Sequence, residues 1–173
     1  PPTAIDVPSV CGRVEFRNVS FEYLPGTQVL QNISLVAKPG QTVALVGHTG
    51  SGKTTVTNLV AKFYLPTSGV VMVDDRDLLE LKTESWQQHL GIMVQQSFLF
   101  SGTVMENIRF SRPRASDQEV HDVVEQLNCT DVFLRLPDGF QTQVGERGSN
   151  LSLGQRPLVC FARSLLTDPK GLV

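Results

Sequence analysis

The sequence predicts a mixed α/β fold, and three observations support that class. Apolar and polar residues alternate over residues 13–23 and 33–37, which is the period of half-buried β-strands. A glycine-rich stretch at 47–52 stands between an apolar run and a segment with apolar residues at helical spacing. Helix-capping pairs and an apolar stripe then indicate helices between about residues 101 and 136.

The first part of the chain is expected to form a β layer. Val14 and Phe16 begin an alternation that slips by one residue at Arg17-Asn18 and resumes at Val19, which predicts a bulge or turn within the strand. Turn residues at 24–27 and a Lys-Pro-Gly break at 38–40 bound a second strand at 33–37. A third, more apolar strand is expected at 42–46.

An amphipathic helix is expected directly after the glycine-rich stretch. Val56, Leu59, Val60 and Phe63 recur at i, i+3, i+4 and i+7, so the period changes from two to 3.6 residues. Further apolar strands are expected at 70–73 and 91–94. The sequence therefore predicts the order strand, glycine loop, helix.

Residues 101–136 are expected to form an inserted helical subdomain. Thr103 with Glu106, and Ser116 with Glu119, have the spacing of capping boxes. A later helix is expected to begin at Ser152 as its N-cap and to end at Asp168-Pro169. No repeat or linker interrupts the chain, so we expect one domain over residues 1–173.

Composition limits the classes of function. The 173 residues carry 15 Lys+Arg and 17 Asp+Glu, and the net charge of −2 disfavours a nucleic-acid partner. Cys11, Cys129 and Cys160 are far apart with no metal-like spacing, which predicts reduced thiols in a cytosolic compartment. No apolar run approaches the ~18–20 residues that span a bilayer, so the chain is expected to be soluble by itself.

A phosphate-binding motif occupies residues 47–54, GHTGSGKT, which match G-x-x-x-x-G-K-[ST] between the predicted strand and helix. Glycines let consecutive backbone N–H groups turn inward, and the helix N-terminus adds its positive dipole end. Lys53 is expected to neutralise the β- and γ-phosphates, and the Thr54 hydroxyl to bind Mg²⁺. The N-K-x-D element that reads guanine is absent from the sequence, which disfavours GTP.

A second motif, Leu151-Ser152-Leu153-Gly154-Gln155, follows the loop 145–148 and precedes a helix. Ser152 at the helix N-cap, together with Gly154, would offer a hydroxyl, backbone N–H groups and a helix dipole to an anion. With the phosphate-binding motif upstream, the chain resembles the nucleotide-binding domain of ABC (ATP-binding cassette) proteins, whose signature is L-S-G-G-Q. The resemblance covers nearly the whole chain, and residues 97–103 and 142–148 are similar to segments of exporter-type members.

The resemblance implies a fold and a set of ligands. The fold is α/β, with a P-loop NTPase core sheet, an N-terminal antiparallel β layer and an inserted α-helical subdomain. The ligands are ATP and Mg²⁺: Tyr23 stands where the family places an aromatic that stacks on adenine, and Gln96 where it has the Q-loop glutamine that contacts Mg²⁺ and the attacking water. Lys53 and Gln96 are therefore the expected catalytic residues, and Thr54 and Gln96 the expected metal ligands. The expected nucleotide-binding residues are Tyr23, Gly47, His48, Thr49, Gly50, Ser51, Gly52, Lys53, Thr54, Thr55, Gln96, Ser152, Gly154 and Gln155.

The resemblance also implies partners and a subtype. In the family, the signature of one domain covers the ATP held by another in a head-to-tail dimer. Residues 142–148, TQVGERG, and 97–103, SFLFSGT, are similar to segments of multidrug and lipid exporters. In these exporters the Glu at the position of Glu146 approaches the coupling helices of the transmembrane domain. An ATPase at the cytoplasmic face of a membrane, attached to a transmembrane domain and powering export, is the function implied.

The sequence departs from the family pattern at several positions. Leu153 replaces a glycine of the signature, which excludes a left-handed backbone there, and Asp74-Asp75 stands where many relatives have Asp-Gly. Pro157 is expected to remove an N–H bond from the second turn of its helix and to kink it. No residue of the chain matches the Walker B Asp, the catalytic Glu or the switch His, so a truncated chain with weak hydrolysis and an exposed sheet edge is expected.

Two other functions stay open at this point. A soluble ABC ATPase acting on DNA or ribosomes would be expected to carry long coiled-coil insertions or basic patches, and the near-neutral charge counts against it. A degenerate regulatory nucleotide-binding module would suit the Leu153 and Pro157 changes and the missing Walker B residues.

Overall fold

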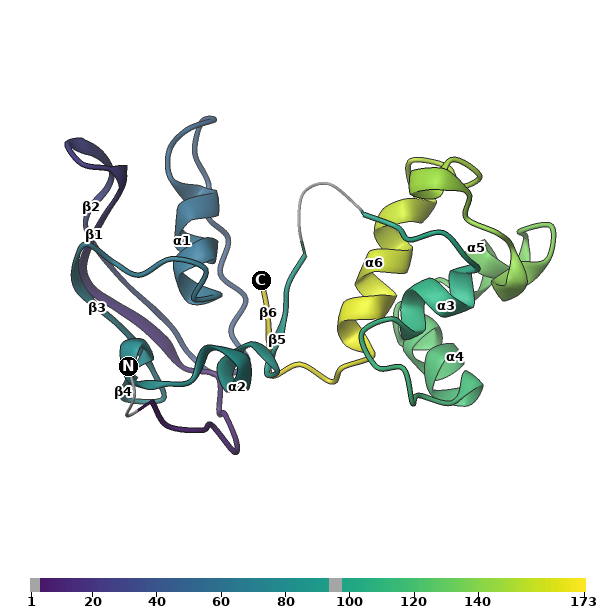
Figure 1. Ribbon diagram of the computed structural model, residues 1–173, viewed down its shortest axis with the longest axis horizontal. Helices are drawn as coiled ribbons and strands as arrows, with labels where there is room; N and C mark the ends of the chain where they lie inside the picture. Colours follow the sequence, from purple (N-terminus) through teal and green to yellow (C-terminus); the bar gives the residue numbers. More distant parts are fainter. Residues whose placement is uncertain (1–3, 94–97) are drawn as a thin grey trace. The chain divides into compact units, whose positions relative to one another are not determined.

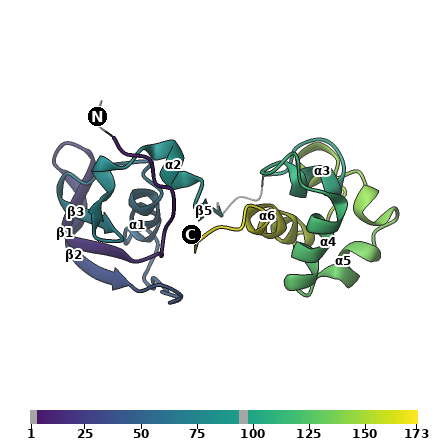
Figure 2. The same ribbon diagram turned by 90° about the horizontal axis from the view of Figure 1, so that it is seen from below.

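The computed structural model describes residues 4–93 and 98–173 of the chain. The chain forms two compact units, residues 1–90 with 173 and residues 91–172. The first, called unit 1, contains the β-strands β1 to β4 and helices α1 and α2 (Figure 1). The second, unit 2, contains helices α3 to α6 (Figures 1 and 2). The mixed α/β class expected from the sequence is confirmed.

A four-stranded antiparallel sheet forms the main layer of unit 1, with strand order β2-β1-β3-β4. Its strands are β1 (Val14–Leu24), β2 (Thr27–Ala37), β3 (Ser68–Val73) and β4 (Arg76–Asp77). Phe16 pairs with Leu35 but Val19 with Ile33, so β1 holds one extra residue between these pairs. The bulge expected at Arg17-Asn18 is confirmed, and Asn18 has a positive φ of 49° there.

The helix expected after the glycine-rich stretch is α1 (Lys53–Val60), which buries Val56 and Leu59. A short helix, α2 (Thr83–Gln87), places Trp86 in the core at 1% exposure. The indole Nε1 of Trp86 donates a hydrogen bond to the carbonyl of Val60 at 2.7 Å. The end of α1 is therefore tied to α2, and Trp86 reports on the packing of unit 1.

The strand expected at 42–46 is not formed, and that prediction is wrong. Residues 41–47 have no regular secondary structure and every residue from 41 to 50 is exposed, with Val46 at 93%. A strand exists only when neighbouring strands accept its backbone hydrogen bonds, and no segment in the described part of the chain pairs with these residues. The apolar side chains of Val43, Leu45 and Val46 thus lie exposed, as an unpaired sheet edge would leave them.

Unit 2 is a helical body around one apolar core. Its helices are α3 (Val104–Arg109), α4 (Asp117–Gln126), α5 (Thr130–Leu134) and α6 (Gln155–Leu165). Both expected capping boxes are present, since the side chains of Thr103 and Ser116 accept from the N–H groups of Glu106 and Glu119. Three of the four helices, α3, α4 and α5, lie within the residues 101–136 for which helices were predicted.

The strand expected at 91–94 is shorter than predicted, and Pro157 lies elsewhere in its helix than predicted. The strand β5 is only Leu90–Gly91, with β6 (Gly171–Leu172) as its partner, and Val94 lies outside the described residues.

Helix α6 begins at Gln155, which places Pro157 in the first turn instead of the second, and the helix continues unbroken to Leu165. First-turn N–H groups have no partner within a helix, so a proline there costs no helical hydrogen bond and causes no kink.

Candidate functional site

The glycine-rich loop at 47–52 is closed by the lysine that follows it. The ammonium of Lys53 donates hydrogen bonds to the carbonyl oxygens of Gly47 and His48, each at 2.8 Å. It also lies 3.4 Å from the hydroxyl of Ser51. Residues 47–51 are exposed and Lys53 is half-buried, so solvent reaches the loop that the ammonium closes.

Gly52 turns the loop into helix α1. It has a left-handed backbone with φ of 85°, and a Cβ at this position would lie 2.6 Å from Cδ2 of Leu30. Glycine is favoured here, because the left-handed backbone strains other residues and a side chain would displace Leu30 on β2. The loop and the start of α1 are in this way fixed against the antiparallel sheet.

The N-terminus of α1 has the properties of an anion site. The N–H of Val56 bonds to the carbonyl of Gly52 at 3.0 Å and so begins the helical ladder, which leaves the preceding amide groups without helical partners. No side chain caps this terminus, and its first turn contains no acidic residue. Uncapped N–H groups, a helix dipole and the Lys53 ammonium together attract a negatively charged oxygen group.

The hydroxyls that follow Lys53 differ in accessibility. Thr54 is exposed at the start of α1, whereas Thr55 is buried. A hydroxyl oxygen is a ligand type that Mg²⁺ accepts, so Thr54 is suited to hold this ion beside a phosphate group. No cluster of three or more His, Cys, Asp or Glu residues that could hold a metal occurs in residues 4–93 and 98–173.

Tyr23, near the end of β1, lies directly beside α1. Its hydroxyl is 3.2 Å from the hydroxyl of Thr55 and accepts a hydrogen bond from the side-chain amide of Asn58 at 3.3 Å. Its ring meets those of Phe21 and Tyr64 edge-on, yet the residue is 45% exposed. The structure therefore brings the expected adenine-stacking residue to the helix that carries Lys53.

The signature segment begins helix α6 in unit 2. The N–H of Ser152 donates to the side-chain oxygen of Gln155 at 2.8 Å, and the N–H of Gln155 donates to the Ser152 hydroxyl at 3.3 Å. The two bonds form a reciprocal pair of the capping-box type. Helix α6 itself begins at Gln155 with Gly154 as its N-cap and no side-chain cap, so the expectation that Ser152 is the N-cap is wrong. Leu153 is 81% exposed and does not have a left-handed backbone, in line with the sequence expectation.

Of the two other expected site residues, Glu146 is described by the structure and Gln96 is not. Glu146 is exposed in a short 3₁₀ turn, η3 (Glu146–Gly148), which follows Gly145 with its φ of 72°. A surface carboxylate on a tightly turned loop is accessible to a partner. Gln96 lies outside the described residues.

Asn58 and Tyr64 are neighbours of Tyr23 that sequence reasoning did not single out. Asn58 follows Thr55 by three positions on α1, so helical spacing alone places the two on one face. That spacing was available from the sequence. The contact of Tyr64 with Tyr23 joins residues far apart in the chain, and no local pattern indicates it.

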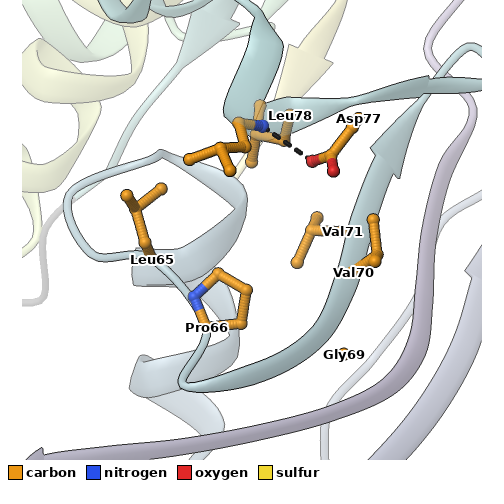
Figure 3. Close-up of a pocket in the computed structure, with 8 residues that line it drawn as sticks. Leu65, Pro66, Gly69, Val70, Val71, Asp77 and Leu78 are labelled. Atoms are coloured by element: carbon orange, nitrogen blue, oxygen red, sulfur yellow. Dashed lines mark hydrogen bonds between the residues drawn. The ribbon is translucent and has the colours of Figure 1, made fainter. Parts of the chain in front are cut away.

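A separate pocket of about 260 Å³ lies in unit 1 (Figure 3). Leu65 and Pro66 face Val71 and Leu78 across it, and the carboxylate of Asp77 accepts a hydrogen bond from the N–H of Leu79 at 2.8 Å. None of its lining residues is an expected nucleotide-binding residue. Its one acidic side chain is already used to cap the short turn η1 (Leu78–Glu80).

Comparison with known proteins identifies the class of this chain. Residues 30–173 match the family of ABC transporters. The chain therefore belongs to the ABC transporter family, and the family resemblance expected from the sequence is confirmed. No helix in the described part of the chain is long and apolar enough to cross a membrane.

Individual relatives indicate the domain and the subtype. The chain is 44% identical over 170 residues to an uncharacterized ABC transporter ATP-binding protein, YfiC, of Bacillus subtilis (strain 168), covering 98% of this chain and 28% of that protein. It is 40% identical over 168 residues to a fatty acid ABC transporter ATP-binding/permease protein of Mycobacterium tuberculosis (strain CDC 1551 / Oshkosh), covering 97% and 27%. A solved structure of a bacterial Atm1-family ABC exporter with ATP bound matches with a TM-score of 0.88 and 36% identity, covering 98% of this chain and 31% of that one. The chain is thus the ATP-binding domain of an exporter-type ABC protein, and it spans less than a third of the length of these relatives.

Proposed function

We propose that this chain binds ATP with Mg²⁺ at residues 47–55 and, within a longer protein, hydrolyses it to power export of a substrate. The observation that carries the proposal is the position of Lys53, whose ammonium is held over the glycine loop at the uncapped N-terminus of α1. The positive charge of Lys53 and the uncapped N–H groups complement the negative phosphate chain of a nucleoside triphosphate. The relative with ATP bound supports the choice of nucleotide.

The described residues have distinct roles in this proposal. The loop amides and Lys53 hold the β- and γ-phosphates, and binding draws the ammonium from the carbonyls of Gly47 and His48 towards phosphate oxygen. Tyr23 stacks on the adenine. Thr54 would hold Mg²⁺ together with Gln96, and the ion, when bound, neutralises charge on the phosphates. Lys53 then stabilises the negative charge of the transferred phosphoryl group.

The signature segment serves a second copy of the domain. Ser152, Gly154 and Gln155 lie exposed or half-buried at the start of α6, where the Ser152 hydroxyl and first-turn amide groups can face a phosphate held by a partner. The partner is a second nucleotide-binding domain in a head-to-tail dimer. Glu146 would approach the coupling helices of a transmembrane domain, which places the chain at the cytoplasmic face of a membrane.

Hydrolysis by these 173 residues alone is expected to be slow. Phosphoryl transfer needs a group that orients the attacking water, and the residues that serve as catalytic Glu, Walker B Asp and switch His in the family have no counterpart in the sequence. Binding depends on the loop and on α1, which are present. The chain should therefore bind ATP in clear excess over any turnover.

Calorimetric titration with Mg-ATP tests the proposal, with phosphate release followed in the same samples. We expect saturable binding that Lys53→Ala weakens by more than tenfold, because the variant removes the only cation that contacts the loop carbonyls in the described structure. Lys38→Ala, an exposed lysine in the turn before the loop, is the matched control and should bind as the wild type does. Equal binding by Lys53→Ala and wild type would refute the proposed site.

A further inference from the structure

Tyr23 is held by more than the strand that carries it. Its hydroxyl accepts a hydrogen bond from Nδ2 of Asn58 at 3.3 Å and lies 3.2 Å from Oγ1 of Thr55. A phenol has one proton to donate and can also accept, so it can satisfy both neighbours at once. The hydroxyl end of Tyr23 is thereby tied to the first two turns of α1.

The ring of Tyr23 packs against two other aromatic rings, both perpendicular to it. The centroid of Phe21 lies 4.7 Å away and that of Tyr64 lies 5.0 Å away, both with interplanar angles of 90°. Phe21 and Tyr64 also touch each other, with centroids 5.7 Å apart. Edge-to-face contacts of this kind are favourable beyond the area they bury. Phe21 is buried and anchors the group to the sheet, whereas Tyr64 follows α1 and is 45% exposed.

The contacts leave Tyr23 both ordered and accessible. A side chain that is already fixed loses less rotational freedom when a ligand stacks on it, so preorganisation raises affinity. Asn58 is half-buried and Tyr64 is exposed, and neither belongs to the buried core of unit 1. Their contacts with Tyr23 accordingly affect the surface of the site more than the stability of the fold.

We propose that Asn58 and Tyr64 are positioning residues that hold Tyr23 for stacking on the adenine of ATP. Asn58 acts through the Tyr23 hydroxyl and Tyr64 through the Tyr23 ring. This inference rests on the proposed function, because it takes Tyr23 as the base platform. It adds a link between base and phosphates, since Thr55, which contacts the Tyr23 hydroxyl, follows Lys53 by two residues on the same helix.

A comparison of two ligands separates positioning from a merely structural role. Mg-ATP and magnesium tripolyphosphate share the phosphate chain, but only ATP has a base. Asn58→Ala, Tyr23→Phe and Tyr64→Ala should each raise the Kd for ATP by about 3- to 10-fold and leave the Kd for tripolyphosphate unchanged. Tyr64→Phe keeps the ring and should retain wild-type affinity. Phe63→Ala, the exposed neighbour of Tyr64, is the matched control and should change neither Kd.

A double-mutant cycle tests the hydrogen bond itself. Tyr23→Phe and Asn58→Ala remove the same bond from its two ends, so the double variant should bind ATP no more weakly than either single variant. Additive losses, ATP affinity that survives in Asn58→Ala and Tyr64→Ala, or equal losses for tripolyphosphate would each overturn the inference. Far-UV circular dichroism of each variant confirms that it is folded.

The same titrations distinguish this inference from the proposed function. Loss of both ligands in Lys53→Ala, with ATP binding unaffected by Tyr23→Ala, would keep the phosphate site and reject Tyr23 as the base platform together with its positioning residues. Absence of ATP binding in the wild-type chain would reject the proposed function and this inference together.

Discussion

Arg163 on α6 donates two hydrogen bonds to Asn107 on α3, from Nε to the backbone carbonyl at 2.8 Å and from Nη2 to the side-chain oxygen at 3.0 Å. Asn107 is 2% exposed and also bonds to both backbone groups of Phe100, each at 2.9 Å. Burial lowers the pKa of Arg163, and its hydrogen bonds compensate for the loss of hydration of the charged guanidinium. One amide side chain thus joins α3, α6 and the segment before α3.

We expect Asn107→Ala to destabilise unit 2 by about 2–3 kcal/mol, because it removes the side-chain acceptor of Arg163 Nη2 and leaves both backbone groups of Phe100 without their amide partner. Urea unfolding followed by far-UV circular dichroism measures the loss. Gln126→Ala, at the exposed end of α4, is the control and should change the free energy of unfolding by less than about 0.5 kcal/mol. A loss for Asn107→Ala as small as that of the control would show that the network contributes nothing.

Two glycines of the loop should respond differently to alanine. Gly50 and Gly52 have similar positive φ values of 83° and 85°, but a Cβ at Gly50 meets open space whereas one at Gly52 meets Leu30 at 2.6 Å. Gly50→Ala should cost about 1–2 kcal/mol of backbone strain alone. Gly52→Ala should cost about 1–3 kcal/mol more, because the side chain of Leu30 must move. Denaturation followed by Trp86 fluorescence measures both variants, and equal losses would contradict the predicted contact.

Local patterns predicted those parts of the fold that depend on near neighbours in sequence. The bulge in β1, the helix after the glycine loop and the capping boxes at Thr103 and Ser116 all follow from periodicity or from three-residue spacings. The prediction of a strand at 42–46 was wrong because a strand depends on partners that are distant in sequence. Its apolar run is typical of a buried strand, but strand formation requires partner strands, and none pairs with it in the described residues.

Some residues of the candidate site were predictable from local motifs, whereas others depend on tertiary contacts. Lys53, Thr54 and the Ser152–Gln155 pair were predictable, since each motif is contiguous and its chemistry is local. The roles of Asn58 and Tyr64 depend on β1 lying beside α1, which is a tertiary contact. The Asn107–Arg163 pair likewise connects residues that no periodicity relates.

The Asp74-Asp75 turn between β3 and β4 should respond oppositely to glycine at its two positions. Both residues have positive φ, 45° and 65°, which glycine adopts without strain. The carboxylate of Asp74 accepts hydrogen bonds from the N–H groups of Cys11 at 2.7 Å and Arg13 at 2.9 Å, whereas Asp75 makes one exposed ion pair with Arg13. Asp75→Gly should therefore stabilise unit 1 by about 0.5–1 kcal/mol, and Asp74→Gly should destabilise it by about 1–2 kcal/mol. Thermal unfolding of the two variants measures the signs, and a shared sign would refute this assignment of roles.

The carboxylate of Glu15 makes the stability of β1 dependent on pH in acid. Arg17 and Arg13 both bond to Glu15, with N–O distances of 2.8 Å and 2.7 Å, and these contacts lower the pKa of Glu15 from 4.5 to about 2. In the folded chain Glu15 stays charged as the pH falls below 4.5, while in the unfolded chain it takes up a proton. Its stabilising contribution is therefore complete above pH 4.5 and is lost as the pH falls through about 2. Glu15→Gln should be less stable than the wild type at pH 7, and the difference should shrink steadily below pH 4.5 in urea unfolding series. The control Glu125→Gln, at an exposed position of α4, should show no such convergence, and a Glu15→Gln deficit that stays constant down to pH 3 would mean that the two arginines do not hold this carboxylate in its charged form.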